Sequence, residues 1–414
     1  MTTAIVDTEE FAQKLKAAAL AAEKKANLTP VFLRRDSFAS TAISTGSLCL
    51  DYILGGGIPP SRIVGIAGPE RSGKTLIATE ITSNHLKSKG FSVYLDAEGS
   101  NDPLFLKSRG IDFDKYRGKR NKKGDLKKED VDHIHFYQPA TVEQIADYMH
   151  TFMGAMPEDR NPDSPRILFT LDSVVALVSD ALSEDLDSNK MAMHARAYSQ
   201  YLPIINSALI RAGCTLVYTN QLRQKPGVQY GSPLYEPAGD ALKFFSSIRL
   251  QLSQTKPKAK GNDHPFLSKV VAPGVEPKQG GNWYEPHYDE NGVEIGQDVY
   301  NYTAVRTIKN RLYNPYQVCY IRIQSRENGA TGRGLDKVFD VFTFLYEHNY
   351  IIKPFKTKGD FELAKDMPYD VAKKTKMPDK FTYKDFKIWV NQNPGVVEKL
   401  RKDLLVSGLI YNYD

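Results

Sequence analysis

The sequence predicts an α/β fold in which helices cover both faces of a mostly parallel β-sheet. Short apolar runs alternate with helical patterns from Ser61 onward, and they read "RIVGIAG", "SVYLDAE", "RILFTLDS", "CTLVYTNQ" and "SIRLQLS". This alternation is typical of β–α units that build a parallel sheet. The stretch "LIATEITSNHLKSKG" has the apolar spacing of a helix and is expected to stop at Gly90.

The first segment is expected to be an arm, which we place at residues 1–38. The stretch "TEEFAQKLKAAALAAEKKAN" offers Thr8 as a helix cap and sets Phe11, Leu15 and Leu20 near one face, and the strand-like "VFLRRDS" follows it. An arm without a core of its own is expected to pack on another surface, so its predicted role is oligomerisation. A frayed terminus is the alternative.

Composition limits the classes of protein to consider. With 414 residues, 41% of them hydrophobic and 25% charged, the chain reads as an ordinary globular protein. Its formal net charge of +6 is mild, so any affinity for nucleic acid must come from local patches. Cys49, Cys214 and Cys319 lie far apart without metal-ligand spacing, which indicates buried thiols in a reducing compartment.

The sequence gives no sign of a membrane protein. No apolar run approaches the ~18 residues of a membrane helix, and the first residues, "MTTAIVDTEE", lack the basic and apolar blocks of a signal peptide. A cytoplasmic location is therefore expected.

Two stretches interrupt the alternation, and a third region follows it. The basic stretch "KYRGKRNKKGDLKKED" and the Pro-, Gly- and charge-rich stretch from Ser253 to Tyr300 are expected to be exposed insertions. The basic one is either a solvated face or a secondary contact for duplex DNA. After Gly334 the pattern "LDKVFDVFTFLYEHNYIIK" begins, and we expect a small α/β or mostly helical domain over 334–414 after a core over 39–333.

The stretch "GPERSGKT", from Gly68 to Thr75, matches the full G-x-x-x-x-G-K-[ST] pattern between a predicted strand and a predicted helix. In such a loop, backbone N–H groups and the helix N-terminus face phosphate groups. The spacing predicts that Lys74 reaches the β- and γ-phosphate oxygens and that Thr75 ligates Mg²⁺.

Acidic residues stand at two further strand ends, where open α/β sheets bind their ligands. Asp172 ends "ILFTLD", the position of an aspartate that helps to hold Mg²⁺. Glu98 follows "VYLDA" and is a candidate to deprotonate a water molecule, with a solvated loop acid as the alternative. In "NDPLFLKSRG", Asp102 has the position of a helix cap before proline.

These stretches together resemble one family. The runs "STGSLCLDYILGGGIPPSRIVGIAGPERSGKT", "LDAEGSNDPLF", "LDSVVAL", "MHARAYSQ" and "NQLRQKPGVQYGSPLYEPAGDALKFFSSIRL" are similar, in this order, to RecA-family recombinases and their phage relatives of the UvsX type. The similarity covers most of Ser44 to Gln251 and returns at "VRTIKNRLYNPYQVCYIRI". Several ordered motifs are far more specific than a phosphate-binding loop alone.

The resemblance implies a nucleotide site for ATP and Mg²⁺. Its expected residues are the phosphate loop (Gly68, Pro69, Glu70, Arg71, Ser72, Gly73, Lys74 and Thr75), the adenine contacts Asp102 and Phe105, the catalytic Glu98, the γ-phosphate sensor Gln221, and Thr75 with Asp172, the latter through water, at Mg²⁺. Lys309 and Arg311 resemble the pair that reaches the ATP of the neighbouring subunit, and Lys243 and Phe244 resemble subunit-interface residues.

It also implies two DNA-binding loops, near 183–193 and 222–240. Their expected DNA contacts are Met191, Arg196, Arg223, Lys225, Gly227 and Gly239. Basic groups there would neutralise phosphates, and glycines would let the backbone approach closely. For Met191, burial within a helix is the alternative. The 222–240 loop would then take its order from the nucleotide through Gln221.

The sequence also departs from the bacterial pattern. Phe105 stands where the bacterial protein has Tyr, Pro203 and Arg311 replace Arg and Lys, Ala238 and Asp240 replace Gly and Asn, and the end "SGLIYNYD" lacks an acidic tail. With its two insertions, the chain is expected to be closer to the phage type.

The predicted function is that of an ATP-dependent DNA recombinase and DNA-dependent ATPase. It would form helical homo-oligomeric filaments on single-stranded DNA and exchange strands with homologous duplex DNA, with single-strand-binding and loader proteins as further partners. A hexameric replicative helicase motor and a nucleotide-switched assembly protein are the alternatives. Glu98 disfavours the latter, because assembly alone needs no water-activating base.

Overall fold

The computed structural model describes the chain in stretches. These are residue 18 and residues 42–119, 132–156, 166–179, 190–224, 234–255, 283–288, 291–326, 334–352, 361–363, 380–393, 395–396 and 399. Two compact units divide the chain, Met1–Thr41 and Ala42–Asp414. The predicted arm over 1–38 lies outside the described residues except for Ala18. The second unit is the one described below.

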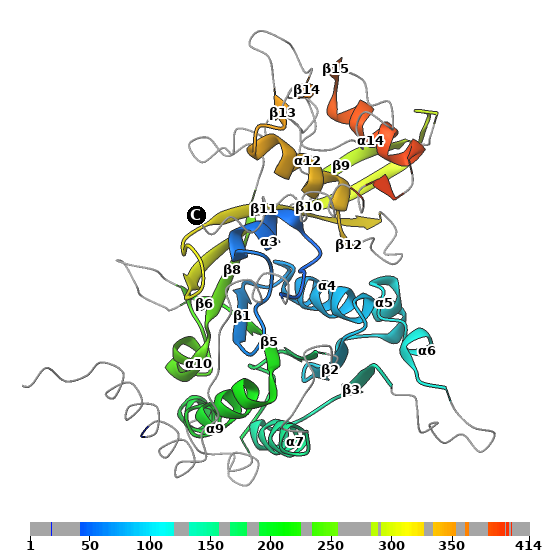
Figure 1. The fold of residues 1–414 in the computed structure, drawn as a ribbon. Helices are drawn as coiled ribbons and strands as arrows, with labels where there is room; N and C mark the ends of the chain where they lie inside the picture. Colours follow the sequence, from blue (N-terminus) through cyan, green and yellow to red (C-terminus); the bar gives the residue numbers. More distant parts are fainter. Residues whose placement is uncertain are drawn as a thin grey trace, which may run out of the picture. The chain divides into compact units, whose positions relative to one another are not determined.

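A sheet of ten strands forms the centre of this unit, among the residues that the structure describes (Figure 1). Its order is β12-β11-β10-β8-β1-β5-β4-β2-β3, with β9 paired to β10. Six neighbouring strands are parallel, as the alternation predicts. They are β1 (Ile63–Gly68), β2 (Phe91–Asp96), β3 (Ile134–Tyr137), β4 (Ile167–Asp172), β5 (Cys214–Gln221) and β8 (Ile248–Thr255).

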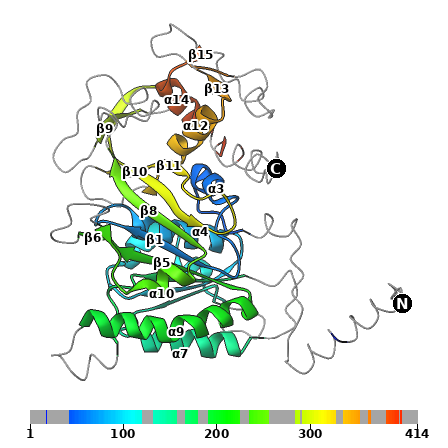
Figure 2. The same ribbon diagram turned by 90° about the vertical axis from the view of Figure 1, so that its left-hand side faces the viewer.

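Helices cover both faces of the parallel strands (Figure 2). α4 (Lys74–Lys87) packs on one face, against β1, β2, β4 and β5, and α5 (Pro103–Ser108) and α6 (Phe113–Tyr116) follow β2. α7 (Val142–Gly154), α9 (Lys190–Ala212) and α10 (Asp240–Phe245) form the other cover, in which α9 contacts both α7 and α10. The apolar core is split by the sheet in the same way.

Local sequence signals start and stop these helices. Asp102 caps α5 by accepting a hydrogen bond from the Leu104 backbone N at 2.6 Å, with Pro103 in the first turn, as predicted. The end of α4 differs from the expectation, because the helix stops at Lys87 and Lys89 takes the positive φ of 60°. Gly90 is needed for another reason. A Cβ there would lie 2.2 Å from the buried imidazole of His85.

The strands on the far side of β8 in the sheet order are antiparallel. β10 (Glu294–Asn310) pairs with β8, with β11 (Val318–Arg326) and, near its start, with β9 (Trp283–Tyr288). The end of the stretch 253–300 is therefore not an exposed insertion, since Val299 and Tyr300 are buried strand residues. Residues 256–282 of that stretch and 120–131 of the basic stretch lie outside the described residues.

The C-terminal region is attached to the sheet through the buried Arg322 of β11. Its guanidinium donates to Asp336 Oδ2 from Nε at 2.8 Å and from Nη2 at 2.6 Å, and Nη2 also donates to the Tyr383 hydroxyl at 2.8 Å. The rings of Tyr300 and Phe339 lie 3.8 and 4.7 Å from its central carbon. Arg322 thus joins strands of the sheet to two C-terminal helices.

The described elements of this region include both helices and strands. They are α12 (Lys337–Glu347), α14 (Tyr383–Gln392), β12 (Gly334–Leu335) and a small sheet of β13 (Ile351–Ile352), β14 (Phe361–Leu363) and β15 (Lys380–Phe381). α3 (Leu48–Leu54) packs on α12, and one apolar cluster runs from the large sheet through α12 to α14.

Cys49, Cys214 and Cys319 are free and buried, as expected. None of the described helices is both long and apolar enough to cross a membrane.

Candidate functional site

The phosphate loop leaves β1 at the carboxyl edge of the sheet and runs into α4. Within it, the Lys74 Nζ and the Ser72 hydroxyl both donate to the Pro69 carbonyl, each at 2.8 Å. Gly73 has φ 93°, and a Cβ on Gly68 would lie 2.4 Å from Ser72 Oγ. Only glycine fits these two positions, because a side chain would be strained at Gly73 and would clash at Gly68. The result is a tight turn that leads into the N-terminus of α4, where backbone N–H groups can bind an anion.

Three strands outside the loop hold it in place. Gln254 of β8 donates to the Arg71 carbonyl at 3.0 Å, and Thr303 of β10 donates to the Ser72 carbonyl at 3.2 Å. A Cβ on Gly73 would meet Ile323 of β11 at 2.5 Å. The antiparallel side of the sheet therefore supports the loop that the parallel side produces.

Asp172 lies beside this loop, at the end of β4, and is buried. Thr219 of β5 donates a short hydrogen bond to its Oδ1, and the Tyr94 hydroxyl of β2 donates to its Oδ2 at 3.3 Å. Burial raises the pKa of Asp172, hydrogen bonds from Thr219 and Thr75 oppose the rise, and the negative charge of Glu98 adds to it. Sequence reasoning missed Thr219 and Tyr94, although both stand near ends of predicted strands.

Glu98 follows β2 and points back toward β4. Its Oε1 accepts a hydrogen bond from the Ser173 hydroxyl at 2.5 Å, and its backbone N donates to the Asp172 carbonyl at 3.3 Å. The carboxylate is exposed rather than enclosed. Ser173 was not predicted as a site residue, although it directly follows Asp172 in "LDS". The Asp172–Ser173 peptide is cis.

The charges of the neighbouring carboxylates act on Lys74. Burial lowers the pKa of the Lys74 ammonium, and the negative charges of Glu98, Asp172 and Glu70 oppose this shift, in that order of size. A cation held among carboxylates near a helix N-terminus is suited to triphosphate and its divalent ion. The structure thus gathers the predicted loop, Asp172 and Glu98 at one edge of the sheet.

Gln221 joins this group from the end of β5, where its Cα is in register with Gly68 of β1. Its side-chain Nε2 donates to Glu70 Oε1 at 3.0 Å, so the residue just before the predicted 222–240 loop contacts the phosphate loop. Arg223 follows in β6 (Arg223–Gln224), which pairs with β7 (Leu234–Tyr235), and its side chain is exposed. Lys225 and Gly227 lie outside the described residues.

The two predicted DNA loops meet at their bases. Gly239 has φ 81°, and a Cβ there would lie 2.8 Å from Ala195 Cβ of α9. Arg196, the next residue of α9, is exposed. Met191 lies on α9, but its side chain is outside the described set, as are residues 183–189 of the first loop.

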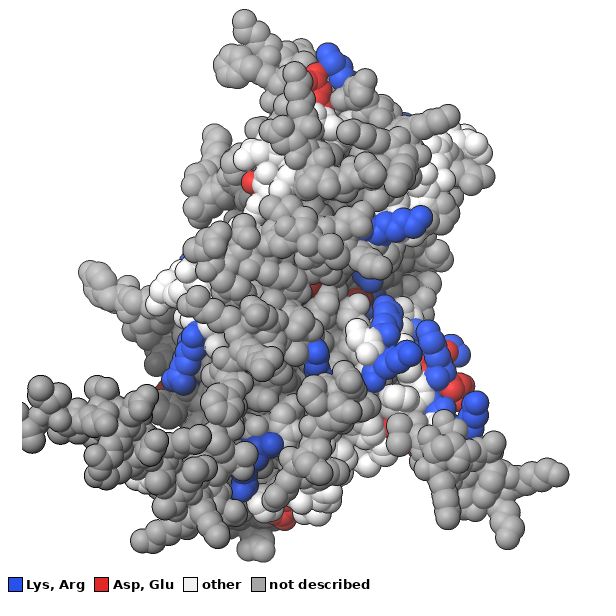
Figure 3. Space-filling view, in the orientation of Figure 1, with Lys and Arg blue, Asp and Glu red and all other residues white. Residues whose placement is uncertain are grey.

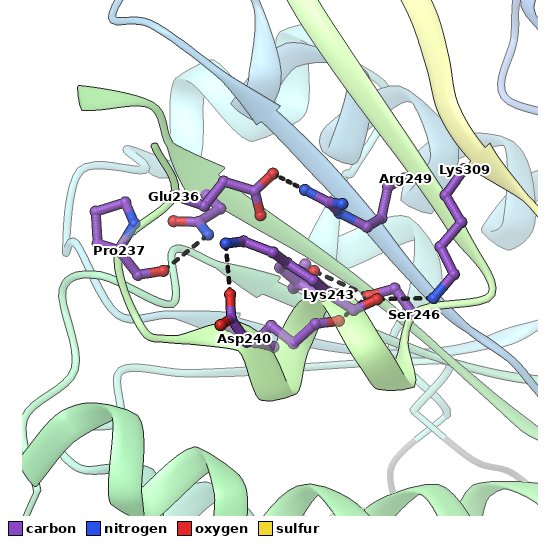
Figure 4. A network of polar contacts seen from close by, with 10 residues as sticks. Glu236, Pro237, Asp240, Lys243, Ser246, Arg249 and Lys309 are labelled. Carbon is purple, nitrogen blue, oxygen red and sulfur yellow. Dashed lines mark hydrogen bonds and ion pairs between the residues drawn. The ribbon is translucent and has the colours of Figure 1, made fainter. Parts of the chain in front are cut away.

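The predicted interface residues form a second group (Figure 4). It lies near the start of β8, at the ends of the parallel strands opposite the phosphate loop. The Lys309 Nζ donates to the carbonyls of Lys243 and Phe244 at the end of α10, at 2.7 and 3.0 Å. Arg311 lies with its guanidinium carbon 5.9 Å from the Phe244 ring centre, and Phe244 is 66% exposed. Burial lowers the pKa of Lys309 to about 8, and the charges of Arg311 and Arg249 contribute.

Strand register shows why this group is separate from the phosphate loop. Lys309 pairs with Arg249 at the start of β8, whereas the phosphate loop begins beyond Gly68, at the opposite ends of β1 and β8. Arg249 also forms a partly buried ion pair with Glu236 at the return of the 222–240 loop (Figure 4). The geometry therefore links Lys309 to the 222–240 loop and α10, not to the phosphate loop of its own chain.

Cations gather over α5, α6 and the end of α4 (Figure 3). The exposed ones are Lys87, Lys89, Lys107, Lys115, Arg117 and Lys119. Lys107 forms an ion pair with Asp112 at 3.2 Å. In the sequence, Lys119 is followed by the basic segment from Arg120 to Lys128, which lies outside the described residues.

A parallel sheet with a glycine-rich loop at its carboxyl edge, and acidic side chains at the neighbouring strand ends, is typical of P-loop α/β proteins. The model of the RecA N-terminal domain matches residues 16–272. The chain belongs to the RecA family.

Bacterial relatives agree with this assignment. The chain is 34% identical to Protein RecA of Arthrospira platensis and 36% identical to that of Trichodesmium erythraeum (strain IMS101), each over 222 residues, or 53% of this chain and 54% of the relative. Protein RecA of Clostridium novyi (strain NT) is 35% identical over 243 residues, or 57% of this chain and 61% of the relative. The chain spans about half the length of the curated relatives that it matches.

Proposed function

We propose that this protein is an ATP-dependent DNA recombinase, which forms helical filaments on single-stranded DNA and exchanges strands with homologous duplex DNA. The observation that carries the proposal is the hydrogen bond of 3.0 Å from Gln221 Nε2 to Glu70 Oε1. It joins the root of the 222–240 loop to the phosphate loop, so a nucleotide at the loop and DNA on 222–240 would influence each other. Reciprocal effects of two ligands follow from such a coupling.

The nucleotide-binding part of the proposal rests on the loop Gly68–Thr75. Its glycines keep the backbone open, and Lys74 would hold the β- and γ-phosphates by charge. Asp102 and Phe105 on α5 would contact adenine. Phe105 is only partly buried, so part of its ring is accessible to a base.

The same residues fit Mg²⁺. This ion prefers oxygen ligands and keeps several water molecules, so it needs few protein groups beside the phosphates. Thr75 and Asp172 supply such oxygens, and the Thr75 side chain lies close enough to Asp172 to lower its pKa. Among the described residues no cluster of three or more His, Cys, Asp or Glu side chains could hold a metal ion. When bound, the ion would neutralise charge on the phosphate oxygens.

Hydrolysis would use Glu98 as the general base. Its carboxylate takes one proton from a water molecule as the water oxygen bonds to the γ-phosphorus and the bond to the β–γ bridging oxygen breaks, which gives ADP and phosphate. Ser173 fixes the carboxylate by donating to Oε1 at 2.5 Å, and the other oxygen is left for the water. A general base contributes typically about 10²–10⁴-fold to a rate.

Assembly would complete the site. Lys309 and Arg311 lie at the edge of the sheet opposite their own phosphate loop, beside the exposed Phe244. At a subunit boundary, Phe244 and Lys243 would contact the neighbour, and the two cations would face its ATP. Charge placed at the transferring phosphate stabilises the transition state. The N-terminal arm, over 1–38, would support the same assembly, and 334–414 would form the C-terminal domain.

DNA contacts are assigned to the two loops. Arg223, Lys225, Gly227 and Gly239 would follow the backbone of single-stranded DNA from the 222–240 loop, and Met191 and Arg196 from the loop near 183–193. The contact between Gly239 and Ala195 supports a joint site, because it brings the bases of the two loops together.

The relation to phage recombinases of the UvsX type is part of the proposal, with a bacterial or phage-infected cytoplasm as the site of action. It is supported by the stretches near Lys122 and over 256–282, which interrupt the family pattern. Single-strand-binding and loader proteins are proposed as further partners.

Electron microscopy with single-stranded DNA and a slowly hydrolysed ATP analogue tests the assembly, and a strand-exchange assay with homologous duplex tests the reaction. We expect helical filaments, and exchange only when ATP is present. The Lys74→Ala variant is the control that should lose strand exchange. Closed rings of six subunits would contradict the proposal and favour the helicase alternative.

A further inference from the structure

Arg109, at the end of α5, is a buried arginine that the site described above does not use. Arg109 is only 7% exposed, and neither its Nε nor its Nη1 has a hydrogen-bond partner. Burial lowers the pKa of the guanidinium, and the negative charge of Glu80 opposes this. Buried donors without partners are uncommon because they lose their hydration. The position therefore needs an explanation beyond packing.

The guanidinium lies behind the aromatic ring of Phe105. Its central carbon is 5.1 Å from the ring centre, within the range of a cation–π interaction. The backbone holds the pair together as well, since the Arg109 N donates to the Phe105 carbonyl at 3.2 Å.

Other elements close the space around Arg109. A Cβ on Gly334, at the start of β12, would lie 2.5 Å from Arg109 Nη1 and 2.9 Å from Glu80 Oε1 of α4. Gly334 has φ 88°, so both the backbone and the space require glycine there. The guanidinium is thus confined between α5, α4 and β12 and has little freedom to leave the ring.

We propose that Arg109 is a positioning residue that fixes Phe105 as the platform on which the adenine base of ATP stacks. This inference rests on the proposed function, which assigns Phe105 to the base. A cation over a ring is attracted by its electron-rich face and holds the ring in one orientation. A ring that is already ordered loses less conformational entropy when the base stacks on it. Arg109 therefore acts on the base, not on the phosphates.

A ligand with a base and a ligand without one distinguish an effect of Arg109 on base binding from an effect on phosphate binding. Calorimetric titration of the full chain with ATP and with inorganic tripolyphosphate measures binding with and without a base, independently of hydrolysis. The Arg109→Met variant should bind ATP about two- to thirtyfold more weakly, the range of one cation–π contact, and tripolyphosphate as the wild type does. An equal loss for both ligands would overturn the proposal. Lys115→Met removes a comparable cation, 5.5 Å from the Tyr116 ring, and should change neither affinity.

A double-mutant cycle tests whether Arg109 acts through Phe105. The variant Phe105→Leu with Arg109→Met should bind ATP as weakly as Phe105→Leu alone, because the cation no longer has a ring to hold. Additive losses would mean that Arg109 acts independently of the ring, and the proposal would be wrong.

The conservative variant Arg109→Lys keeps the charge and should stay within about threefold of the wild type for ATP. If it loses as much as Arg109→Met, the charge is not the cause and the proposal is wrong. Should Arg109→Met fail to fold, Arg109→Gln, which also removes the charge, takes its place in the same cycle with Phe105→Leu, with the same requirement of non-additivity.

The Lys74→Ala variant distinguishes failure of this inference from failure of the proposed function. It should lose affinity for both ATP and tripolyphosphate. If it binds both as the wild type does, the phosphate site itself is misassigned. If it behaves as expected and Arg109→Met shows no base-dependent loss, only the role of Arg109 is wrong.

Discussion

The side-chain amide of Gln221 donates a hydrogen bond to the carboxylate of Glu70 over 3.0 Å, from the end of β5 to the phosphate loop. A γ-phosphate beside the loop would compete with Glu70 for that amide. We therefore expect Gln221→Ala to bind ATP normally but to lose the increase in single-stranded DNA affinity that ATP gives. Fluorescence anisotropy with a slowly hydrolysed ATP analogue and with ADP measures the ratio of the two affinities, which should fall toward one.

Glu70→Ala is the matched control, because it frees the same amide without removing it. This variant should keep a ratio well above one. A Gln221→Ala protein that still responds to ATP as the wild type does would show that the loop takes its order from another residue.

Glu98→Gln should separate binding from hydrolysis. The amide has no basicity to take the proton of water, so we expect ATP turnover to fall by roughly 10²–10⁴-fold while filaments still form. A phosphate-release assay and electron microscopy measure the two properties. Ser173→Ala should cost less, since it only frees the carboxylate. Turnover of Glu98→Gln within a few-fold of the wild type would reduce Glu98 to an exposed loop acid.

Arg223→Ala should weaken single-stranded DNA binding and flatten its dependence on salt. Each lost phosphate contact lowers the slope of log affinity against log salt by about 0.7 for single strands. Binding isotherms at several salt concentrations give this slope. Arg211→Ala, an exposed arginine at the end of α9, is the control and should leave the slope unchanged. If both variants keep the wild-type slope, the 222–240 loop does not follow the DNA backbone through Arg223.

Lys309→Ala and Lys74→Ala should complement each other in mixed filaments. The first keeps a sound phosphate loop and gives its neighbour nothing, whereas the second has a defective loop and still supplies Lys309. Some boundaries in a mixture then contain both working parts. DNA-stimulated ATPase of the mixture should exceed the sum of the two variants alone. Co-assembly without this gain would place the action of Lys309 within its own chain, or nowhere in hydrolysis.

Lys309 should also make stability depend on pH. Its pKa is about 8 in the folded chain, against 10.5 for an ordinary lysine, so between these values the unfolded chain binds more protons. Its contribution to stability therefore rises with pH across that window and is lost as pH falls toward 8. Urea unfolding should show Lys309→Met gaining on the wild type at pH 7, with the gain shrinking by pH 10. A difference that stays constant with pH would contradict the shifted pKa.

The sequence allowed the strands and the phosphate loop to be predicted because their signals are local. Eight consecutive residues carry the loop pattern, and apolar runs mark the strand ends where Asp172 and Glu98 lie. The contacts that hold those side chains come from other strands. Ser173 reaches Glu98 and Thr219 reaches Asp172 only after β2, β4 and β5 are aligned, and no spacing along the chain records that alignment.

The antiparallel strands were also difficult to predict from local sequence signals. The stretch before Tyr300 looked like an exposed insertion because its composition is polar and rich in turn formers. Tyr300 is nevertheless buried, because Arg322, distant in sequence, lies against its ring. The functions assigned to Arg223, Lys309 and the other site residues stay predictions until the experiments above are done.

The buried guanidinium of Arg322 bears on how this gene can be shortened. A stop codon placed just before Gly334 would remove Asp336, which neutralises the guanidinium, and Tyr383, which accepts from it, while Arg322 stays inside β11. An uncompensated buried charge is strongly destabilising. Such a truncation is therefore a change to the hydrophobic core as well as the loss of an accessory region. A shortened form that is to remain soluble would need a neutral, apolar residue in place of Arg322.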